Sequence, residues 1–312
     1  MGMRAGRRRH PRPAHRPPAS RRRRLGLPFR TGAVYPGAAA TGDPINMTPG
    51  DLVVFSDLDG TLLDHDSYSW DPARPALDRL AALGVPVVLA SSKTAAEIAV
   101  IRAEMGLDAW PAIVENGAGL LAPGARPAAP GPDYLRLRRM IDALPDQLRR
   151  HFSGFGDWTD AEAADRTGLP PAAARLARIR AFSEPGLWSG DASDRDAFLD
   201  ALAAGGISGR EGGRYLTLSF GGTKADRMAE VMQSLERPRS IALGDAPNDA
   251  EMLRAADIGV IVANPHGPGI PALDGADPAR IRRSTKSGPA GWNEMILTLV
   301  SDQAGQTAGG ME

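Results

Sequence analysis

The 312-residue sequence contains no cysteine at all. The chain therefore forms no disulfide and no thiolate metal site, and enzymes that attack through a cysteine thiolate are excluded. It also lacks any stretch approaching the roughly 20 apolar residues needed to cross a bilayer, so we expect no membrane partner. A reducing compartment suits a chain without disulfides, and we expect a cytoplasmic protein.

Lysine is scarce as well. Only three of the 37 basic residues are lysines, namely Lys93, Lys224 and Lys286, and the rest are arginines. Lysine carries a compact point charge, whereas arginine is a planar fork with five donors. A lysine in so arginine-rich a sequence therefore indicates a position that needs a compact positive charge.

Metal-binding histidine patterns are also missing. Outside the first 50 residues the histidines are His65, His151 and His266, and their spacing matches no metal-ligand pattern. We interpret all three as ordinary surface or core residues. The chain has no Arg-His-Gly sequence, so we do not expect a phosphohistidine mechanism, and it has no internal repeat.

The balanced net charge conceals two unlike parts. Residues 1–50 carry eleven arginines and a single acid, Asp43. The remaining residues carry 26 basic and 36 acidic side chains (37 less 11 and 37 less 1), a balance of −10. Arginine blocks at 7–9 and 21–24, interspersed with prolines, predict a disordered basic tail over 1–50.

Two interpretations of this tail stay open. It is either an arm for nucleic acid or another anionic surface, or a solvated extension with no such partner. Translation from Met47 would remove it and leave 266 residues (312 less 46). The tail lacks the 7–15-residue apolar segment of a secretory signal, and its prolines disfavour the amphipathic helix of a transit peptide. We favour a solvated extension, or a stretch that is not translated, and do not expect a nucleic-acid partner.

From residue 51 onward, short apolar runs alternate with segments of helical pattern. Such runs are typical of strands buried on both faces, and alternation with helices predicts an α/β fold with a parallel sheet. The expected strands are Leu52–Phe55, Val85–Ala90, Ala112–Val114, Ile241–Leu243 and Ile258–Val262.

Two of the expected helices have clear end signals. Asp71–Pro72 predicts an N-cap followed by proline at the first helical position, and Gly84 predicts the end of that helix. Thr94 and Glu97 have the spacing of a capping box, and Gly106 predicts the end of the second helix.

Polar side chains follow each expected strand. Ligands of open α/β sheets bind outside the carboxyl ends of the strands, so we expect these side chains to converge on one site. They are Asp57, Ser91 with Ser92, Glu115 with Asn116, Asp245, and Asn264.

Residues 132–220 interrupt the strand–helix alternation and predict an inserted α/β cap. Two helical stretches (Tyr134–Leu144 and Ala172–Ala181) and a strand (Arg214–Ser219) are expected there, with a loop-rich run from Gly154 to Pro171. The catalytic core would then comprise residues 51–131 and 221–302, followed by a disordered tail at 303–312.

The most informative motif is Asp57-Leu58-Asp59-Gly60-Thr61, directly after the first strand. Two carboxylates at this spacing can both face the site, since Gly60 supplies the permissive backbone of the turn. One carboxylate can attack phosphorus, while the other protonates the leaving oxygen and later deprotonates water. We expect Asp57 and Asp59 to be catalytic.

A second acidic motif, Gly244-Asp245-Ala246-Pro247-Asn248-Asp249, follows the fourth expected strand. Carboxylates added beside Asp57 and Asp59 need a neutralising cation, and Mg²⁺ prefers such oxygen ligands. The alternative is an ordinary loop and helix cap. In combination with the first motif, we favour a magnesium site.

Phosphate-binding candidates come from two further segments. Ser91, Ser92 and Lys93 open a helix, where a hydroxyl, backbone N–H groups and the helix N-terminus favour an anion. Lys224 follows Gly221-Gly222-Thr223 and is expected to hold the phosphate and the nucleophile.

In this order, the four segments resemble the motifs of the haloacid dehalogenase-like phosphatase superfamily. The resemblance implies a Rossmann-like core, with Asp57 as nucleophile and Asp59 as general acid and base. It also implies Mg²⁺ held by Asp57, the backbone carbonyl of Asp59, and Asp245. Asn248 and Asp249 would lie just behind these ligands. The position of the cap and Glu115-Asn116-Gly117-Ala118 look like the subgroup with a large α/β cap.

Within that subgroup the sequence most resembles the mannosyl-3-phosphoglycerate phosphatase family. The similar segments include Tyr68-Ser69-Trp70, Phe182-Ser183-Glu184-Pro185, Gly212-Gly213-Arg214-Tyr215 and Gly288-Pro289-Ala290-Gly291-Trp292. One departure is Thr223, where that family usually has aspartate. Another is the short, Ala- and Arg-rich cap.

The resemblance implies dephosphorylation of mannosyl-3-phosphoglycerate to mannosylglycerate. Because the phosphoryl chemistry is shared by all monoesters, the substrate must be selected by groups that touch the leaving group. The candidates are Asn116, Arg180, Glu184 and Arg214. Glucosyl-3-phosphoglycerate or another sugar phosphate, phosphoryl transfer in place of hydrolysis, and nucleic-acid binding through the tail remain alternatives.

Overall fold

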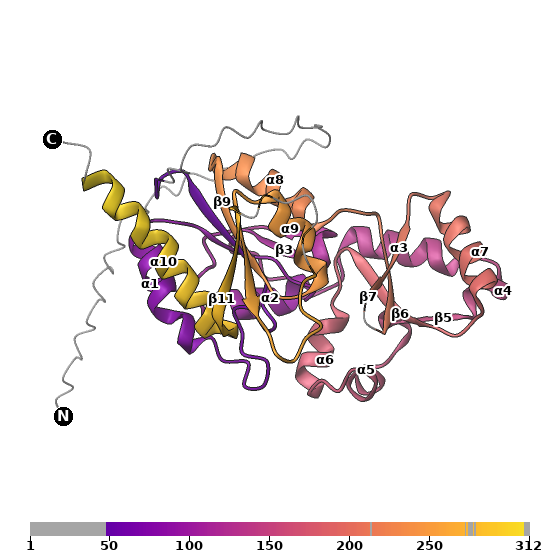
Figure 1. The fold of residues 1–312 in the computed structure, drawn as a ribbon. Coiled ribbons are helices and arrows are strands. Elements are labelled where there is room, and N and C mark those ends of the chain that lie inside the picture. Colours follow the sequence, from indigo (N-terminus) through magenta and orange to yellow (C-terminus); the bar gives the residue numbers. More distant parts are fainter. Residues whose placement is uncertain (1–47, 213, 272, 274–276, 278, 309–312) are drawn as a thin grey trace, which may run out of the picture. The chain divides into compact units, whose positions relative to one another are not determined.

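The computed structural model describes residues 48–308 except 213, 272, 274–276 and 278 (Figure 1). The basic tail that we predicted lies, up to residue 47, outside these residues. Within them, a parallel sheet and a separate antiparallel sheet are each packed with helices. None of the described helices has the length and apolar character needed to cross a membrane.

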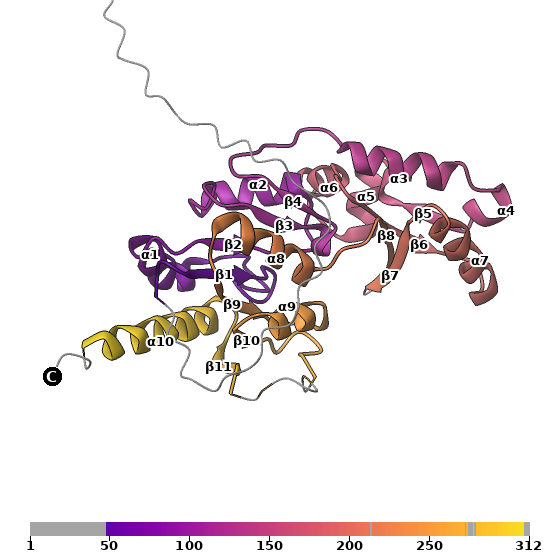
Figure 2. The same cartoon turned by 90° about the horizontal axis from the view of Figure 1, so that it is seen from above.

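The central sheet has five parallel strands in the order β11-β10-β9-β1-β2 (Figure 2). The predicted α/β class with a parallel-sheet core and a cap is confirmed. β1 lies between β2 and β9, so the chain adds strands on one side of β1 and then on the other. The strands are β1 (Leu52–Ser56), β2 (Val87–Leu89), β9 (Arg239–Gly244), β10 (Ile258–Ala263) and β11 (Ile281–Ser287).

Helices cover both faces of this sheet, because alternate side chains of each strand point in opposite directions. Leu52 and Val54 of β1 join one hydrophobic cluster, whereas Val53 and Phe55 join the other. The first cluster contains side chains of α1 (Arg74–Ala82), α2 (Ala95–Glu104) and α10 (Gly288–Ala308). The second contains side chains of α8 (Lys224–Leu235) and α9 (Ala250–Ala255).

The helix-end predictions were partly right. Thr94 and Glu97 form the expected capping box, and Gly84 and Gly106 adopt the left-handed conformation just beyond their helices. Asp71 does not cap a helix, because a short 3₁₀ segment (Asp71–Ala73) precedes α1. Helix α10 runs to Ala308, into the segment that we had expected to be a disordered tail.

One strand prediction needs correction. β3 (Ala112–Val114) exists, but it pairs antiparallel with β4 (Gly119–Leu121), which the sequence analysis did not identify. β3 lies beside the end of β2 through a parallel bridge between Ala90 and Ile113, and the Ser91 N–H donates to the Ile113 carbonyl at 3.0 Å. The β11 strand, which the analysis also missed, completes the sheet at the other side. Its pattern is polar, with only Ile281 as an apolar residue, so hydrophobic periodicity could not reveal it.

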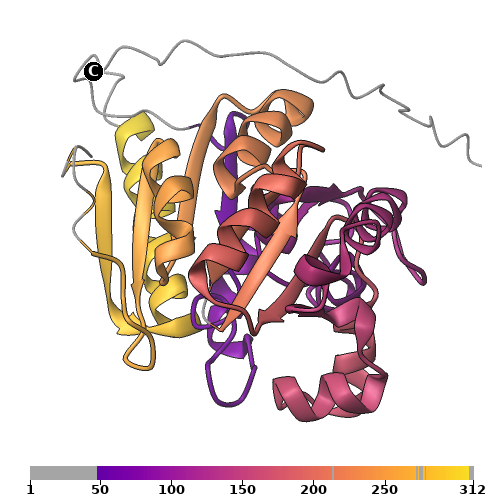
Figure 3. The ribbon, with the colours of Figure 1, turned by 90° about the vertical axis from the view of Figure 1, so that its right-hand side faces the viewer.

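The cap, defined here as residues 132–219, is coloured from magenta to orange in Figure 3. It contains an antiparallel sheet in the order β5-β6-β8-β7. The run Gly154–Pro171 is not merely loop-rich, since it contains a capped helix, α5 (Asp160–Thr167). The cap strands are β5 (Phe152–Gly154), β6 (Ser183–Trp188), β7 (Ser208–Gly212) and β8 (Tyr215–Ser219). Its other helices are α3 (Pro132–Asp142), α4 (Asp146–Arg149), α6 (Pro171–Arg178) and α7 (Ala192–Ala203).

Candidate active site

The pairing of β1 with β9 brings two acidic segments together. Ser56 is the register partner of Leu243, and the N–H of Asp57 donates to the Leu243 carbonyl at 2.9 Å. The residues after both strands therefore emerge side by side at the carboxyl edge of the sheet. Asp57, Asp245 and Asp249 are all buried, and each offers a carboxylate oxygen within 4.8 Å of the others.

Lys224 connects this cluster. It is the first residue of α8 and is itself buried. Its Nζ donates to Oδ1 of Asp57 and to Oδ1 of Asp249, both at 2.7 Å. Thr223, the residue that departs from the family pattern, is the N-cap of α8 and forms a capping box with Asp226. This cap fixes the start of the helix and thereby the position of Lys224.

The cluster carries excess negative charge. Three carboxylates against one ammonium leave two formal negative charges in a buried site. Burial raises the pKa of Asp57 well above its usual value, and repulsion from Asp249 raises it further, although Lys224 opposes both effects. Burial likewise raises the pKa of Asp245. Although burial opposes it, the Asp249 and Asp57 carboxylates raise the pKa of Lys224.

These residues fit a divalent cation. Hard oxygen donors in a buried, net-negative cluster are the ligands that Mg²⁺ prefers. A bound cation would neutralise the two excess charges and favour the ionised form of Asp57. Of the expected ligands, the structure brings the Asp57 and Asp245 carboxylates together. The third carboxylate of this cluster comes from Asp249, which we had expected just behind the ligands.

Asp59 lies toward the predicted phosphate-binding segment. Its Oδ2 pairs with Lys93 Nζ at 2.8 Å, and its Oδ1 is buried with no hydrogen-bond partner in the described part of the chain. Although burial opposes it, Asp59 raises the pKa of Lys93. Ser91 is buried and its Oγ accepts from the Lys93 N–H, whereas Ser92 is exposed.

Two further side chains hold the acidic cluster in place. Thr61 Oγ1 donates to Asp245 Oδ1 and Asn264 Nδ2 donates to Asp245 Oδ2, both at 2.6 Å. The sequence analysis expected Asn264 at the carboxyl edge of the sheet and named Thr61 only as part of the first motif. The tertiary structure shows that both contact Asp245.

The candidate substrate-selecting residues occupy different environments. Asn116 accepts from Asn248 Nδ2 at 3.3 Å, beside the acidic cluster. Arg180 is buried and donates to Ser183, and Glu184 is buried and accepts from Arg138 at 2.7 Å.

Arg214 is exposed and donates to the carbonyl of Thr167. Its contact, like that of Glu184 with Arg138, lies within the cap, whereas Arg180 also pairs with Glu115 of the core at 3.4 Å. A direct contact of these three residues with substrate stays a prediction.

Glu115 connects the core to the cap. Its buried carboxylate accepts from the backbone N–H groups of Ala181 (2.7 Å), Phe182 (3.2 Å) and Ser183 (2.7 Å), and from Ser183 Oγ (2.7 Å). Its own N–H donates to the Lys93 carbonyl at 3.0 Å. One residue thus contacts both the predicted phosphate-binding segment and the cap, a link that sequence spacing could not reveal.

Comparison with known proteins agrees with this arrangement. The family model for haloacid dehalogenase-like hydrolases matches residues 54–123 and 213–268, which include Asp57, Asp59, Ser91, Lys224, Asp245 and Asp249. The predicted resemblance to the haloacid dehalogenase-like hydrolases is therefore confirmed, and the unmatched residues between the two segments include most of the cap.

Solved structures share this haloacid dehalogenase-like fold. One is a haloacid dehalogenase-like hydrolase from Bacteroides thetaiotaomicron, with a TM-score of 0.55 and 18% identity over 79% of this chain and 98% of that one. Another is such a hydrolase from B. subtilis, with a TM-score of 0.52 and 18% identity over 80% and 99%. A third, titled a subclass IIB sugar phosphatase, has a TM-score of 0.52 and 16% identity over 80% and 98%. At these identities the likeness concerns the fold.

Proposed function

We propose that this hydrolase is a magnesium-dependent phosphomonoester hydrolase that forms an aspartyl phosphate on Asp57. The observation that carries the proposal is the Lys224 ammonium, held 2.7 Å from both Asp57 and Asp249 beside Asp245. An ammonium and a divalent cation on one carboxylate cluster provide the positive charge that a phosphoryl group requires. Asp57 contacts Lys224 and shares the cluster with Asp245, so it is the carboxylate that we propose as the nucleophile.

Hydrolysis would proceed in two steps. In the first, a carboxylate oxygen of Asp57 bonds to phosphorus, the bond from phosphorus to the ester oxygen breaks, and Asp59 gives its proton to that oxygen. In the second, water attacks phosphorus, Asp59 takes the water proton, and the acyl phosphate bond breaks to release phosphate and restore Asp57. Oδ1 of Asp59, which has no hydrogen-bond partner among the residues that the structure describes, would make these proton transfers.

The other residues of the site would each have a separate role. Lys224 would hold the Asp57 carboxylate in position, and Ser91 with Lys93 would contact the phosphate oxygens. Asp57, Asp245 and the backbone carbonyl of Asp59 would hold Mg²⁺, which when bound offsets negative charge on the phosphoryl group. Such phosphatases must lower the barrier by an amount near the top of the ~8–23 kcal/mol range or beyond.

For the substrate we propose mannosyl-3-phosphoglycerate, on the family-level similarity of the segments around Trp70, Glu184 and Trp292. Glucosyl-3-phosphoglycerate and other sugar phosphates are the alternatives. We retain them because one protein of similar fold is titled a subclass IIB sugar phosphatase. We expect the cap to make this choice, through Asn116, Arg180, Glu184 and Arg214.

The test is phosphate release by the purified chain, with and without Mg²⁺, across a panel of these substrates. Asp57→Asn preserves shape and removes the nucleophile, so activity should fall to background in a folded protein. Asp78→Asn, the same change at an exposed position of α1, is the matched control. A folded Asp57→Asn variant with wild-type activity would overturn the mechanism. Phosphate transfer to added alcohols, with little release, would instead indicate a phosphotransferase.

A further inference from the structure

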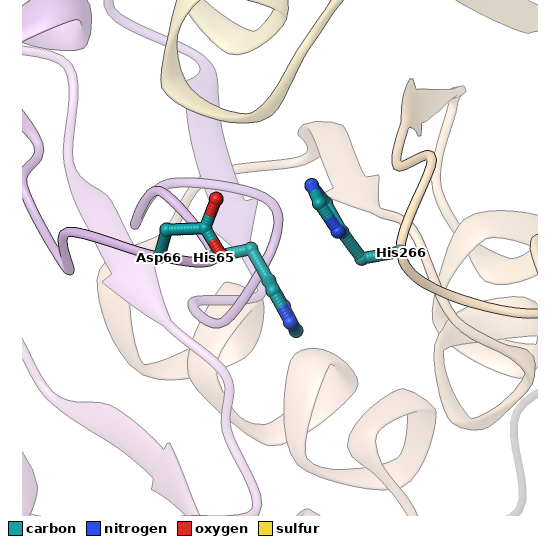
Figure 4. Close-up of side chains that lie close together, drawn as sticks. All are labelled: His65, Asp66 and His266. Carbon is teal, nitrogen blue, oxygen red and sulfur yellow. The ribbon is translucent and has the colours of Figure 1, made fainter.

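Outside the aspartate cluster, the structure brings together three potential metal ligands that are separated in sequence. His65 and Asp66 lie in the turn after the first motif, and His266 lies in the loop after β10. Each offers one ligand atom within 4.8 Å of the other two (Figure 4). The sequence analysis found no metal-ligand spacing for His65 and His266 and interpreted them as surface or core residues; the structure places both at the surface, with their rings stacked.

We propose that His65, Asp66 and His266 form a second cation site, selective for Zn²⁺-type transition metals. Two imidazoles and one carboxylate are typical ligands of Zn²⁺, Co²⁺ and Ni²⁺. Mg²⁺, by contrast, prefers oxygen ligands alone, which the aspartate cluster supplies. Donor chemistry therefore separates the two sites, and the proposal does not rest on the proposed phosphatase activity.

The backbone on both sides of the site is already held in place. Asp64 Oδ1 accepts from the N–H of Ser67 at 2.9 Å and from Ser67 Oγ at 2.7 Å, which fixes the turn that carries His65 and Asp66. In the other loop, the His266 N–H donates to Asn264 Oδ1 at 2.9 Å. Ligands presented by a fixed backbone lose less entropy when they bind an ion.

The side chains need only a local change to bind. The rings of His65 and His266 stack, with centroids 4.6 Å apart and planes inclined by 5°. A metal ion binds in the plane of an imidazole, so two parallel rings cannot ligate one ion as they stand. All three side chains are exposed, which leaves room for one ring to turn. Binding should therefore open the stack, and three protein ligands leave a fourth position for water.

A bound ion would join the turn at 64–67 to the loop at 264–267. Asn264 extends the connection, because its side chain accepts from His266 and donates to Asp245. The second site is thus two hydrogen bonds away from a carboxylate of the aspartate cluster.

The test is calorimetric titration of the full chain with Zn²⁺ in saturating Mg²⁺, repeated with Co²⁺ to follow its absorption spectrum. The double variant His65→Ala/His266→Ala should lose one equivalent of Zn²⁺, or bind it at least tenfold more weakly, about 1.4 kcal/mol. His151→Ala, a histidine of the cap, is the matched control. A His10→Ala/His15→Ala variant removes the two tail histidines, and Asp57→Asn perturbs the aspartate cluster.

The Zn²⁺ equivalent that the double variant should lose should persist in the His151, His10/His15 and Asp57 variants. In wild-type protein, imidazole proton resonances of His65 and His266 should shift when Zn²⁺ opens the stack. The proposal is overturned if the double variant binds Zn²⁺ as the wild type does. It is equally overturned if the His10→Ala/His15→Ala variant no longer binds the Zn²⁺ equivalent, or if Asp57→Asn is the only variant that loses it. Because binding is read without substrate, an inactive enzyme leaves the result unaffected.

Discussion

Replacing Glu115 tests whether one carboxylate attaches the cap to the core. Glu115→Ala would remove the acceptor of three backbone N–H groups and one hydroxyl in a buried junction. A buried donor that loses its partner costs about 1–3 kcal/mol. Because water and local relaxation recover part of four such losses, we expect a total of roughly 3–5 kcal/mol. That is a large share of the ~5–15 kcal/mol stability of a typical domain.

Glu115→Gln sharpens the test. The amide keeps one acceptor oxygen, which can stay against Ser183, and turns its NH₂ group toward the N–H of Ala181. One donor then faces another donor, and the charge opposite Arg180 at 3.4 Å is lost. We expect a smaller loss than for alanine, of about 1–3 kcal/mol.

Urea unfolding and amide hydrogen exchange would measure the two effects. The urea midpoint should be lowest for Glu115→Ala, intermediate for Glu115→Gln and highest for the wild type. Amides 181–183 should lose protection from exchange in both variants. Glu184→Gln, a buried carboxylate that accepts within the cap, is the control and should leave the protection of amides 181–183 intact. If Glu115→Ala unfolds within 0.5 kcal/mol of wild type with those amides still protected, this account of the junction is wrong.

Three other substitutions test particular contacts. Thr223→Ala removes the N-cap of α8 and should lower the free energy of unfolding, measured thermally, by about 1 kcal/mol. Thr223→Asp keeps a capping side chain and should lower it little. Equal losses in the two variants would contradict the capping argument. Gly60→Ala places a methyl group 2.5 Å from Asn264 Nδ2 and 2.9 Å from Asp245 Oδ2, at a φ of +82°. The affinity for Mg²⁺, measured by calorimetry, should therefore fall severalfold. Unchanged affinity would contradict the close approach. Burial raises the pKa of Glu184, so the native state binds its proton more tightly than the unfolded state does. The stability that this group contributes is therefore lost as pH rises through the raised pKa. In urea unfolding, acidification from pH 7 to pH 5 should stabilise the wild type relative to Glu184→Gln. Identical pH dependence of the two proteins would refute this.

Local sequence patterns determined the elements that depend on local contacts. Buried strands such as Leu52–Ser56 appear as continuous apolar runs, and the Thr94 capping box closes within four residues. The motifs around Asp57 and Asp245 were also readable, because the residue after a buried strand must lie at the sheet edge. β11 and the antiparallel partner of β3 were not readable, since polar edge strands and short hairpins lack hydrophobic periodicity.

The contacts that assemble the site were decided by tertiary structure alone. The parallel pairing of β1 with β9 sets Asp57 beside Asp245, and the start of α8 puts Lys224 between Asp57 and Asp249. The same folding brings Glu115 to the cap and His65 to His266, two pairs whose sequence separation carries no signal. Residue type and local spacing specify which chemistry is possible, but strand order and loop paths specify which side chains meet.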